Sequence, residues 1–186
     1  MKVKSLTLGS LLVCSLFLSS CEDCDSPTVT EVTEADAEWL VYEDPKDTIR
    51  FVDEQANVIK YIRTSVRGGN VPGKDTSIDD ECYKNLDTQV TVTIEDVKRK
   101  SPGLATYVLK RPDDLSIGLA VENRKTYDLD ETKPTIEAEV NGKVYQNVFE
   151  LTPAATNPTD VKRILFTKAE GFIRIEFNDN KFLDRQ

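Results

Sequence analysis

The sequence contains no histidine among its 186 residues. This absence excludes the Ser-His-Asp and Cys-His catalytic arrangements, together with zinc and iron sites that use histidine ligands. It also removes the side chain that most often transfers protons near neutral pH. No serine lies in a Gly-x-Ser-x-Gly turn, and the 33 acidic residues form no motif. These absences predict a protein that is not an enzyme, with no catalytic residue and no cofactor.

Positive charge is also in short supply, because 24 basic residues face 33 acidic ones and the net charge is −9. Nucleic acid and anionic lipid headgroups are repelled by an acidic surface, so neither is expected to bind through electrostatics. Long apolar runs are missing as well, except near the N-terminus. There, an apolar stretch over Leu6–Leu18 follows Lys2 and Lys4.

This N-terminal stretch predicts a secretory signal over residues 1–20. The stretch is shorter than the roughly 20 residues that cross a bilayer, and it ends in small residues. The closing run, Leu18-Ser19-Ser20-Cys21, resembles the lipobox of bacterial lipoproteins. The resemblance implies cleavage before Cys21 and its acylation, with palmitate-type chains holding the protein to a membrane. Cleavage would remove two lysines and no acid, and the net charge would fall to −11.

Two neighbouring cysteines fit a lipobox less well. Cys14 lies inside the apolar stretch behind a bulky valine, and Cys24 follows an acidic residue. Three acids follow Cys21, namely Glu22, Asp23 and Asp25. They resemble the export signal of Bacteroidota-type lipoproteins, which implies an outer-membrane position, at the cell surface rather than on the periplasmic face. The alternative is a solvated acidic tether.

The remaining sequence divides into a short tether and one domain. Residues 21–34 are Ser, Thr, Pro and acidic residues, which predicts a lipidated acidic tether, and residues 35–186 are long enough for a single domain. At the start of the domain, Thr33–Asp36 fits the beginning of a short helix, while Glu38–Tyr42 fits a strand equally well.

Period-two alternation dominates the domain and predicts an all-β fold. Apolar residues alternate with mostly polar ones in four stretches: Thr48–Phe51, Gln89–Ile94, Leu115–Val121 and Phe172–Phe177. One apolar face and one polar face are typical of an antiparallel sheet. Asn141-Gly142 predicts a tight hairpin, Ala169–Gly171 a second one, and Asn178–Asn180 a further turn. We expect a single antiparallel meander of about eight or nine strands, curled into a barrel or half-barrel or split into a sandwich. The terminal pattern resembles the closing strands of uncharacterised Bacteroidota-type lipoproteins in the runs Ile164–Phe166, Gly171–Ile173, Glu176-Phe177 and Phe182-Leu183.

With Cys21 acylated, Cys24 and Cys82 remain as a possible disulfide. The alternative is an inert buried thiol at Cys82. A catalytic Cys82 is not expected, because the neighbouring acids raise the pKa of a thiol.

Three further features bear on binding. Asp75, Asp79, Asp80 and Glu81 are candidates for a loose calcium site, although the spacing fails the EF-hand pattern and the main expectation is no metal. The glycine-rich stretch Gly68–Asp80 predicts a long mobile loop suited to binding. Trp39 and the six tyrosines are expected in the core or in cross-strand pairs rather than along a groove.

These features predict a lipid-anchored cell-envelope protein that acts as a non-enzymatic binding or structural module. Its expected partners are the membrane, through the N-terminal lipid, and an envelope protein or glycan. The alternative is a carrier that holds an acyl chain or another hydrophobic ligand in the concave face of a half-barrel.

Overall fold

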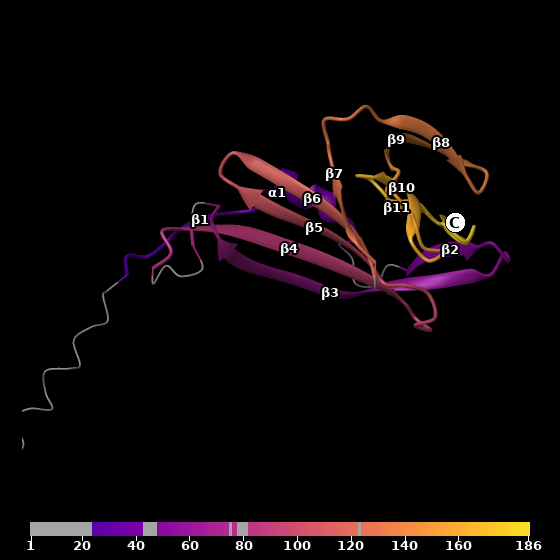
Figure 1. Ribbon diagram of the computed structural model, residues 1–186, viewed down its shortest axis with the longest axis horizontal. Coiled ribbons are helices and arrows are strands. Elements are labelled where there is room, and N and C mark those ends of the chain that lie inside the picture. The colour runs from indigo at the N-terminus through magenta and orange to yellow at the C-terminus, as the bar shows by residue number, and fades with distance from the viewer. Residues whose placement is uncertain (1–23, 43–47, 75, 78–81, 123) are drawn as a thin grey trace, which may run out of the picture.

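The computed structural model describes residues 24–42, 48–74, 76–77, 82–122 and 124–186. These residues form an antiparallel β fold with one short helical segment (Figure 1). The helical segment comprises α1 (Glu34–Ala37) and the 3₁₀ turn η1 (Glu38–Leu40). The first strands are β1 (Thr28–Thr30), β2 (Thr48–Asp53), β3 (Val58–Pro72), β4 (Asn85–Asp96), β5 (Leu104–Arg111), β6 (Asp114–Val121) and β7 (Thr126–Leu129). The later strands are β8 (Ile136–Val140), β9 (Lys143–Leu151), β10 (Val161–Thr167), β11 (Gly171–Phe177) and β12 (Phe182–Arg185). Among the described residues, no helix is long and apolar enough to cross a membrane.

The predicted all-β class is confirmed, but the arrangement is two meanders rather than one. The sheet order is β7-β6-β5-β4-β3-β2-β12-β11-β10-β9-β8, so the run β2–β7 and the run β8–β12 are joined where β12 pairs with β2. The predicted count of eight or nine strands is too low, since the described residues alone form a sheet of twelve. Three of the strands, β1, β7 and β12, are only three or four residues long. Such short strands hold too few residues to show alternation in the sequence.

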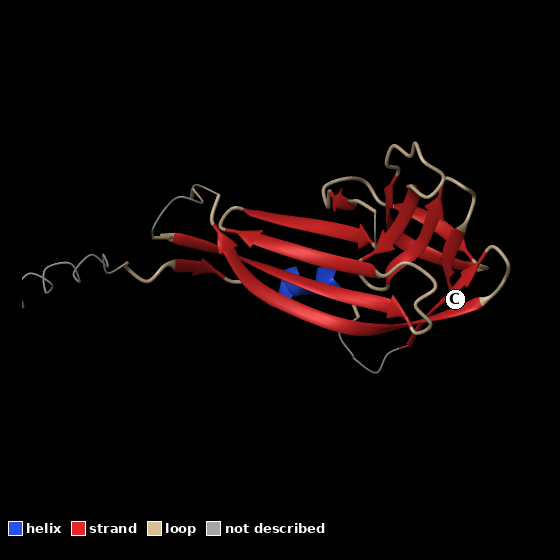
Figure 2. Ribbon diagram, turned by 60° about the horizontal axis from the view of Figure 1, so that its bottom comes forward, coloured by secondary structure: helices blue, strands red, loops and turns tan. Residues whose placement is uncertain are grey.

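The sheet curls into a half-barrel because of one connection. The strands β7 and β8 form the two ends of the sheet order, yet only residues 130–135 separate them in the chain. A connection of that length spans at most roughly 25 Å. The two edges of the sheet must therefore approach each other, and the curled shape is visible in Figures 1 and 2.

The inner faces of the strands build the main core, as the alternation predicts. Fully or almost fully buried side chains come from both meanders and include Ile49, Phe51, Tyr61, Val92, Ile94, Ile117, Leu119, Val121, Ile164, Phe166, Phe172, Ile175 and Phe177. A smaller cluster packs beneath the β8–β9 hairpin and consists of Val140, Tyr145, Val148, Leu165 and Ile173. It forms on the other side of β10 and β11, because a register shift after Leu165 turns Ile173 away from the main core.

The helical segment fills the concave side of the half-barrel. Trp39 and Leu40 of this segment, and Tyr42 two residues after it, are each at most 7% exposed and belong to the main core. The hydroxyl of Thr106 on β5 donates a 2.6 Å hydrogen bond to the carbonyl of Leu40, which fixes the segment against the sheet. Figure 2 shows this segment enclosed by the long strands. The concave face is thus packed with protein side chains.

The helical interpretation of Thr33–Asp36 is confirmed, and the alternative strand over Glu38–Tyr42 is wrong. Thr33 is the N-cap of α1, and its side chain accepts a hydrogen bond from the backbone N–H of Asp36. The Asp36 carboxylate in turn accepts from the backbone N–H of Thr33, which completes a capping box. This reciprocal cap starts the helix on the N-terminal side of the apolar residues Trp39 and Leu40.

The three predicted turns are also confirmed. Asn141 and Gly142 have φ values of 53° and 76° between β8 and β9, as a tight hairpin of this type requires. Gly171 has a φ of 78° at the start of β11, where it closes the β10–β11 connection. Asn180 has a φ of 65° in the turn that leads to β12.

Two predicted boundaries differ from the structure. The glycine-rich stretch predicted as a loop is strand as far as Pro72, with Gly68 opposite Val90 and Gly69 opposite Gln89. Glycine weakens a strand, but pairing along the whole of β4 outweighs that local preference. The predicted tether also ends earlier than residue 34, because Thr28–Thr30 forms β1 and pairs in parallel with β4 beyond the end of β5.

Candidate functional site

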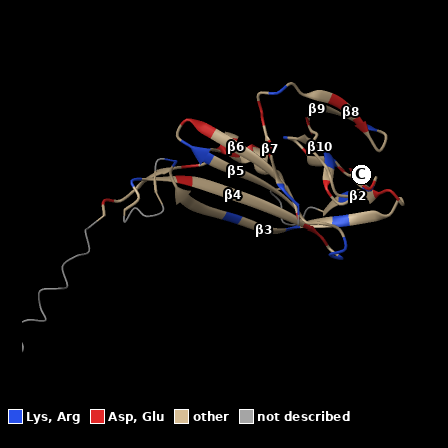
Figure 3. Ribbon diagram, viewed as in Figure 1, with Lys and Arg blue, Asp and Glu red and all other residues tan. Residues whose placement is uncertain are grey.

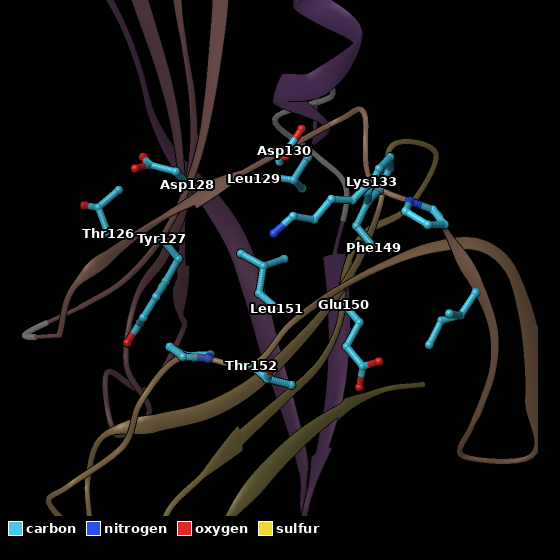
Figure 4. Close-up of a pocket in the computed structure, with 13 residues that line it drawn as sticks. Thr126, Tyr127, Asp128, Leu129, Asp130, Lys133, Phe149, Glu150, Leu151 and Thr152 are labelled. Carbon is cyan, nitrogen blue, oxygen red and sulfur yellow. The ribbon is translucent and has the colours of Figure 1, made fainter.

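A groove of about 610 Å³ opens where the half-barrel does not close. It lies between β7 and the end of β9, and the connection between β7 and β8 passes over it (Figure 4). The lining residues are Thr126, Tyr127, Asp128, Leu129, Asp130, Lys133, Pro134, Ile136, Phe149, Glu150, Leu151, Thr152 and Pro153. We call it the seam groove.

Both strands beside the seam groove present an unpaired edge to it. Within the described residues, β7 pairs with β6 alone. The last residues of β9, Phe149–Leu151, pair with β10 on one side, while the ladder with β8 ends at Val148. Backbone donors and acceptors on these two edges are therefore open to a ligand.

The floor of the seam groove is apolar. Tyr127, Leu129, Phe149 and Leu151 all pack against the main core. The ring of Phe149 lies 5.4 Å, centroid to centroid, from the ring of Trp39, so the helical segment supports the floor from below. Burial raises the pKa of Tyr127, whose phenol stays neutral around neutral pH.

The carboxylates on the rim of the groove already have partners. Asp128 accepts a 3.4 Å hydrogen bond from the hydroxyl of Tyr107. Asp130 accepts from the hydroxyl and the backbone N–H of Thr132, and these hydrogen bonds lower the pKa of the Asp130 carboxyl. These contacts commit both carboxylates to local partners, and the lowered pKa keeps Asp130 ionised at neutral pH.

Glu150, the remaining acid of the rim, belongs to a chain of ion pairs across the outer face of β9–β12. Its carboxylate lies 2.6 Å from Nε of Arg163, which also approaches Glu176 at 3.4 Å. Arg174 joins Glu176 to Asp184 and extends the chain to β12. Glu150 is therefore engaged with the sheet and not with the groove.

Lys133 is the charged group that the seam groove offers to a ligand. Its side chain extends between Leu129 and Leu151 (Figure 4), and it forms no ion pair with any described residue. An ammonium group above an apolar floor suits a ligand with an apolar part and a negative group. The groove volume lies in the range of small-molecule sites, roughly 300–1,000 Å³. The described lining contains no cysteine.

The structure places the predicted cysteines away from this groove, at the end of the molecule where β1 lies (Figure 1). Cys24 and Cys82 are joined in a disulfide with their Cα atoms 5.5 Å apart. Both residues adjoin the paired ends of β1 and β4, so the bridge attaches the N-terminal segment to the sheet. The proposed lipidation residue, Cys21, lies outside the described residues.

The loose calcium site also lies outside the described residues, since it consists of Asp75, Asp79, Asp80 and Glu81. In the part of the chain that the structure describes, no three His, Cys, Asp or Glu residues gather in a way that could hold a metal ion.

The aromatic residues mostly follow the core interpretation. Trp39, Tyr42, Tyr61 and Tyr145 are at most 7% exposed, while Tyr127 lines the seam groove.

Sequence reasoning missed the seam groove entirely. Its residues come from β7, from the connection after it and from β9, which the topology brings together from distant parts of the chain. A local signal was nevertheless present. Lys133-Pro134 and Pro153 stand beside the open edges, and lysine and proline are the residues that commonly protect sheet edges.

Comparison with known proteins gave no relatives: no family model matches the sequence, and neither a curated protein nor a solved structure shows significant similarity to the chain.

Proposed function

We propose that this chain is a lipid-anchored binding module of the bacterial outer membrane, displayed at the cell surface, with no catalytic activity of its own. The single observation that supports binding is the seam groove, where two open strand edges flank an apolar floor and an uncommitted lysine. The anchoring part of the proposal is supported by the lipobox resemblance at Cys21 and by the acids that follow it.

The geometry of the N-terminal end agrees with an anchor. The Cys24–Cys82 bridge and β1 fix the chain to the sheet within a few residues of the proposed acylation site. A short attachment of this kind would hold the domain close to the bilayer, with β7 and β9, which flank the seam groove, further along the long axis than β1 (Figure 1). An anchored module with an outward-facing groove suits contact with another envelope component.

The test is a quantitative pull-down from detergent-solubilised envelopes of the native organism. The groove variant combines Lys133→Ala with Ile136→Ser, because both side chains are exposed at the groove and their loss should leave the fold intact. The matched control combines Lys162→Ala with Val144→Ser, which removes the same kinds of exposed side chain outside the groove. We expect the groove variant alone to lose a specific partner. Identical partner lists for both variants would contradict the groove as the binding site.

A carrier of an acyl chain is the second candidate, and Lys133 is the observation that favours it. A fatty-acid carboxylate could pair with the Lys133 ammonium while its chain lies on Leu129 and Leu151. Against this, the concave face itself is filled by Trp39 and its neighbours. Titration with a fluorescent fatty acid separates the two functions. Saturable binding of the fatty acid by the wild type, weakened by Lys133→Ala, would favour the carrier. Binding of the fatty acid only by the variant Trp39→Ala, in which the core is opened, would favour the module.

A further inference from the structure

A second surface, separate from the seam groove, lies on the outer face of β2, β3 and the turn after β4. We call it the basic strip, and it consists of Arg50, Lys60, Lys98 and Lys100 together with Val58, Ile62 and Val97. Lys60 is its centre. Lys60 stands opposite Arg50 in the β2–β3 ladder, and its carbonyl accepts a 2.9 Å hydrogen bond from the N–H of Val97.

The cations of the basic strip have no acidic partners in the part of the chain that the structure describes. None of the four forms an ion pair or a side-chain hydrogen bond within the described residues. Arg50 and Lys60 are like charges directly opposite each other, an arrangement that costs folding stability. Figure 3 shows basic residues gathered on the turn after β4, below the sheet. This concentration stands out in a chain whose net charge is −9.

Two nearby carboxylates, Asp96 and Asp53, are used by the backbone instead, while a third, Glu95, stands opposite Ile62 and lies 3.9 Å from Arg99. Asp96 is 4% exposed and accepts hydrogen bonds of 2.9 to 3.1 Å from the N–H groups of Lys98, Lys100 and Ser101. Asp53 accepts hydrogen bonds from the N–H groups of Gln55 and Asn57 in the β2–β3 turn. Both carboxylates shape the turns and leave the ammonium groups of the strip free to bind an anion.

The strip also exposes branched aliphatic side chains. Val58 is 49% exposed, Ile62 is 38% and Val97 is 56%. Val58 and Ile62 flank Lys60 on the same face of β3, because alternate residues of a strand share a face. A cleft of about 730 Å³ runs beside them between the β2–β3 turn and the turn after β4. Cations and aliphatic groups therefore alternate along one extended surface.

We propose that the basic strip docks an extended acidic segment of a partner protein, with aliphatic side chains between its carboxylates. Charge complementarity selects an anionic partner, since the rest of the molecule is acidic and repels it elsewhere. The aliphatic side chains select a protein segment over a glycan, because sugars stack on aromatic rings and the strip exposes none. The strip lies at the end of β3 remote from β1, so the partner meets the molecule away from its N-terminal segment (Figure 1).

The test measures binding of a fluorescein-labelled hexapeptide of alternating Glu and Val by anisotropy. We expect saturable binding that weakens as salt rises, with no binding of the Gln and Val counterpart. The variant Lys60→Glu, Lys98→Glu, Lys100→Glu should weaken binding at least about tenfold. The control Arg67→Glu, Lys74→Glu, Lys84→Glu changes the net charge equally but lies outside the strip, and it should weaken binding no more than about twofold.

Two further measurements keep the test decisive. Lys60→Glu alone creates an opposite-charge pair with Arg50, so it should raise the melting temperature while it weakens peptide binding. Val58→Ser with Val97→Ser should weaken binding of the Glu and Val peptide but leave binding of hexaglutamate unchanged.

Equal loss of binding in the two triple variants would overturn the proposal. Tighter binding of heparin or of phosphatidylglycerol vesicles than of the peptide to the strip would also overturn it. Self-association of the chain that the strip variant abolishes would identify a second copy as the occupant, and it would also overturn the proposal.

Discussion

At the scale of single residues, two glycines share a backbone conformation but differ in the stability that their replacement by alanine should cost. Gly142 has a φ of 76°, and no atom lies within 4 Å of the place where an added methyl group would stand. Gly171 has a φ of 78°, but there the added methyl group would collide with the ring and hydroxyl of Tyr42. Gly142→Ala should therefore cost only the backbone strain, about 1–2 kcal/mol. Gly171→Ala should cost about 1–3 kcal/mol more, because Tyr42 is buried and cannot move aside. Chemical denaturation of both variants measures the difference, and equal destabilisation would contradict this packing.

Tyr42 also makes the folding stability depend on pH. Burial raises its pKa from 10.0 to about 12, although Arg185 and the N–H of Phe172 act in the opposite direction. The neutral phenol is thus favoured by folding, so its contribution is complete below pH 10.0 and is lost as pH rises towards about 12. The loss amounts to about 2–3 kcal/mol.

The variant Tyr42→Phe tests this linkage. It should be about 1–3 kcal/mol less stable at neutral pH, because the Phe172 N–H that donates to the Tyr42 hydroxyl is left buried without a partner. Its stability should also fall less steeply than the wild type's between about pH 10 and pH 12. Denaturation series at several alkaline pH values give both results. Parallel curves for the two proteins would mean that Tyr42 does not ionise on unfolding.

At the scale of elements, the disulfide and β1 act together on the long β3–β4 pair. The bridge joins residues 58 positions apart, and a loop of that length contributes about 4 kcal/mol in the chain-entropy estimate. Cys82→Ser should lower the free energy of unfolding by up to that amount, and reductant should destabilise the wild type equally while leaving the variant unchanged. Guanidinium denaturation with and without reductant provides the measurement. Alkylation of both thiols in the unreduced, denatured wild type would show that the bridge does not form.

At the scale of the whole molecule, the elongated half-barrel has its N-terminal attachment at one end and its basic strip at the other (Figure 1). Mass spectrometry of the mature protein should find an acylated Cys21 at the N-terminus, and Cys21→Ser should abolish cleavage and membrane association. A mature chain that begins elsewhere without lipid would remove the basis for the proposed anchor.

The side of the membrane is tested separately. Protease added to intact cells should remove the domain, and replacement of Glu22, Asp23 and Asp25 by alanine should protect it. Equal protection of both forms would place the wild type in the periplasm.

The sequence by itself determined the local features of this fold. Alternation predicted the strands and their buried faces, Asn141-Gly142 predicted its hairpin, and Thr33 predicted a helix start, because each depends on neighbouring residues alone. Gly68–Pro72 was predicted wrongly, because pairing with β4 overrides the preference of glycine for turns.

Only the tertiary structure decided how these parts meet. The pairing of β12 with β2 and the short connection from β7 to β8 bring the two edges of the sheet together and create the seam groove. The register of β2 against β3 likewise sets Arg50 opposite Lys60. The first two contacts join residues far apart in the chain, and their geometry depends on the curl of the whole sheet, which no local pattern in the sequence specifies. The β2–β3 register depends on the geometry of the turn between these strands.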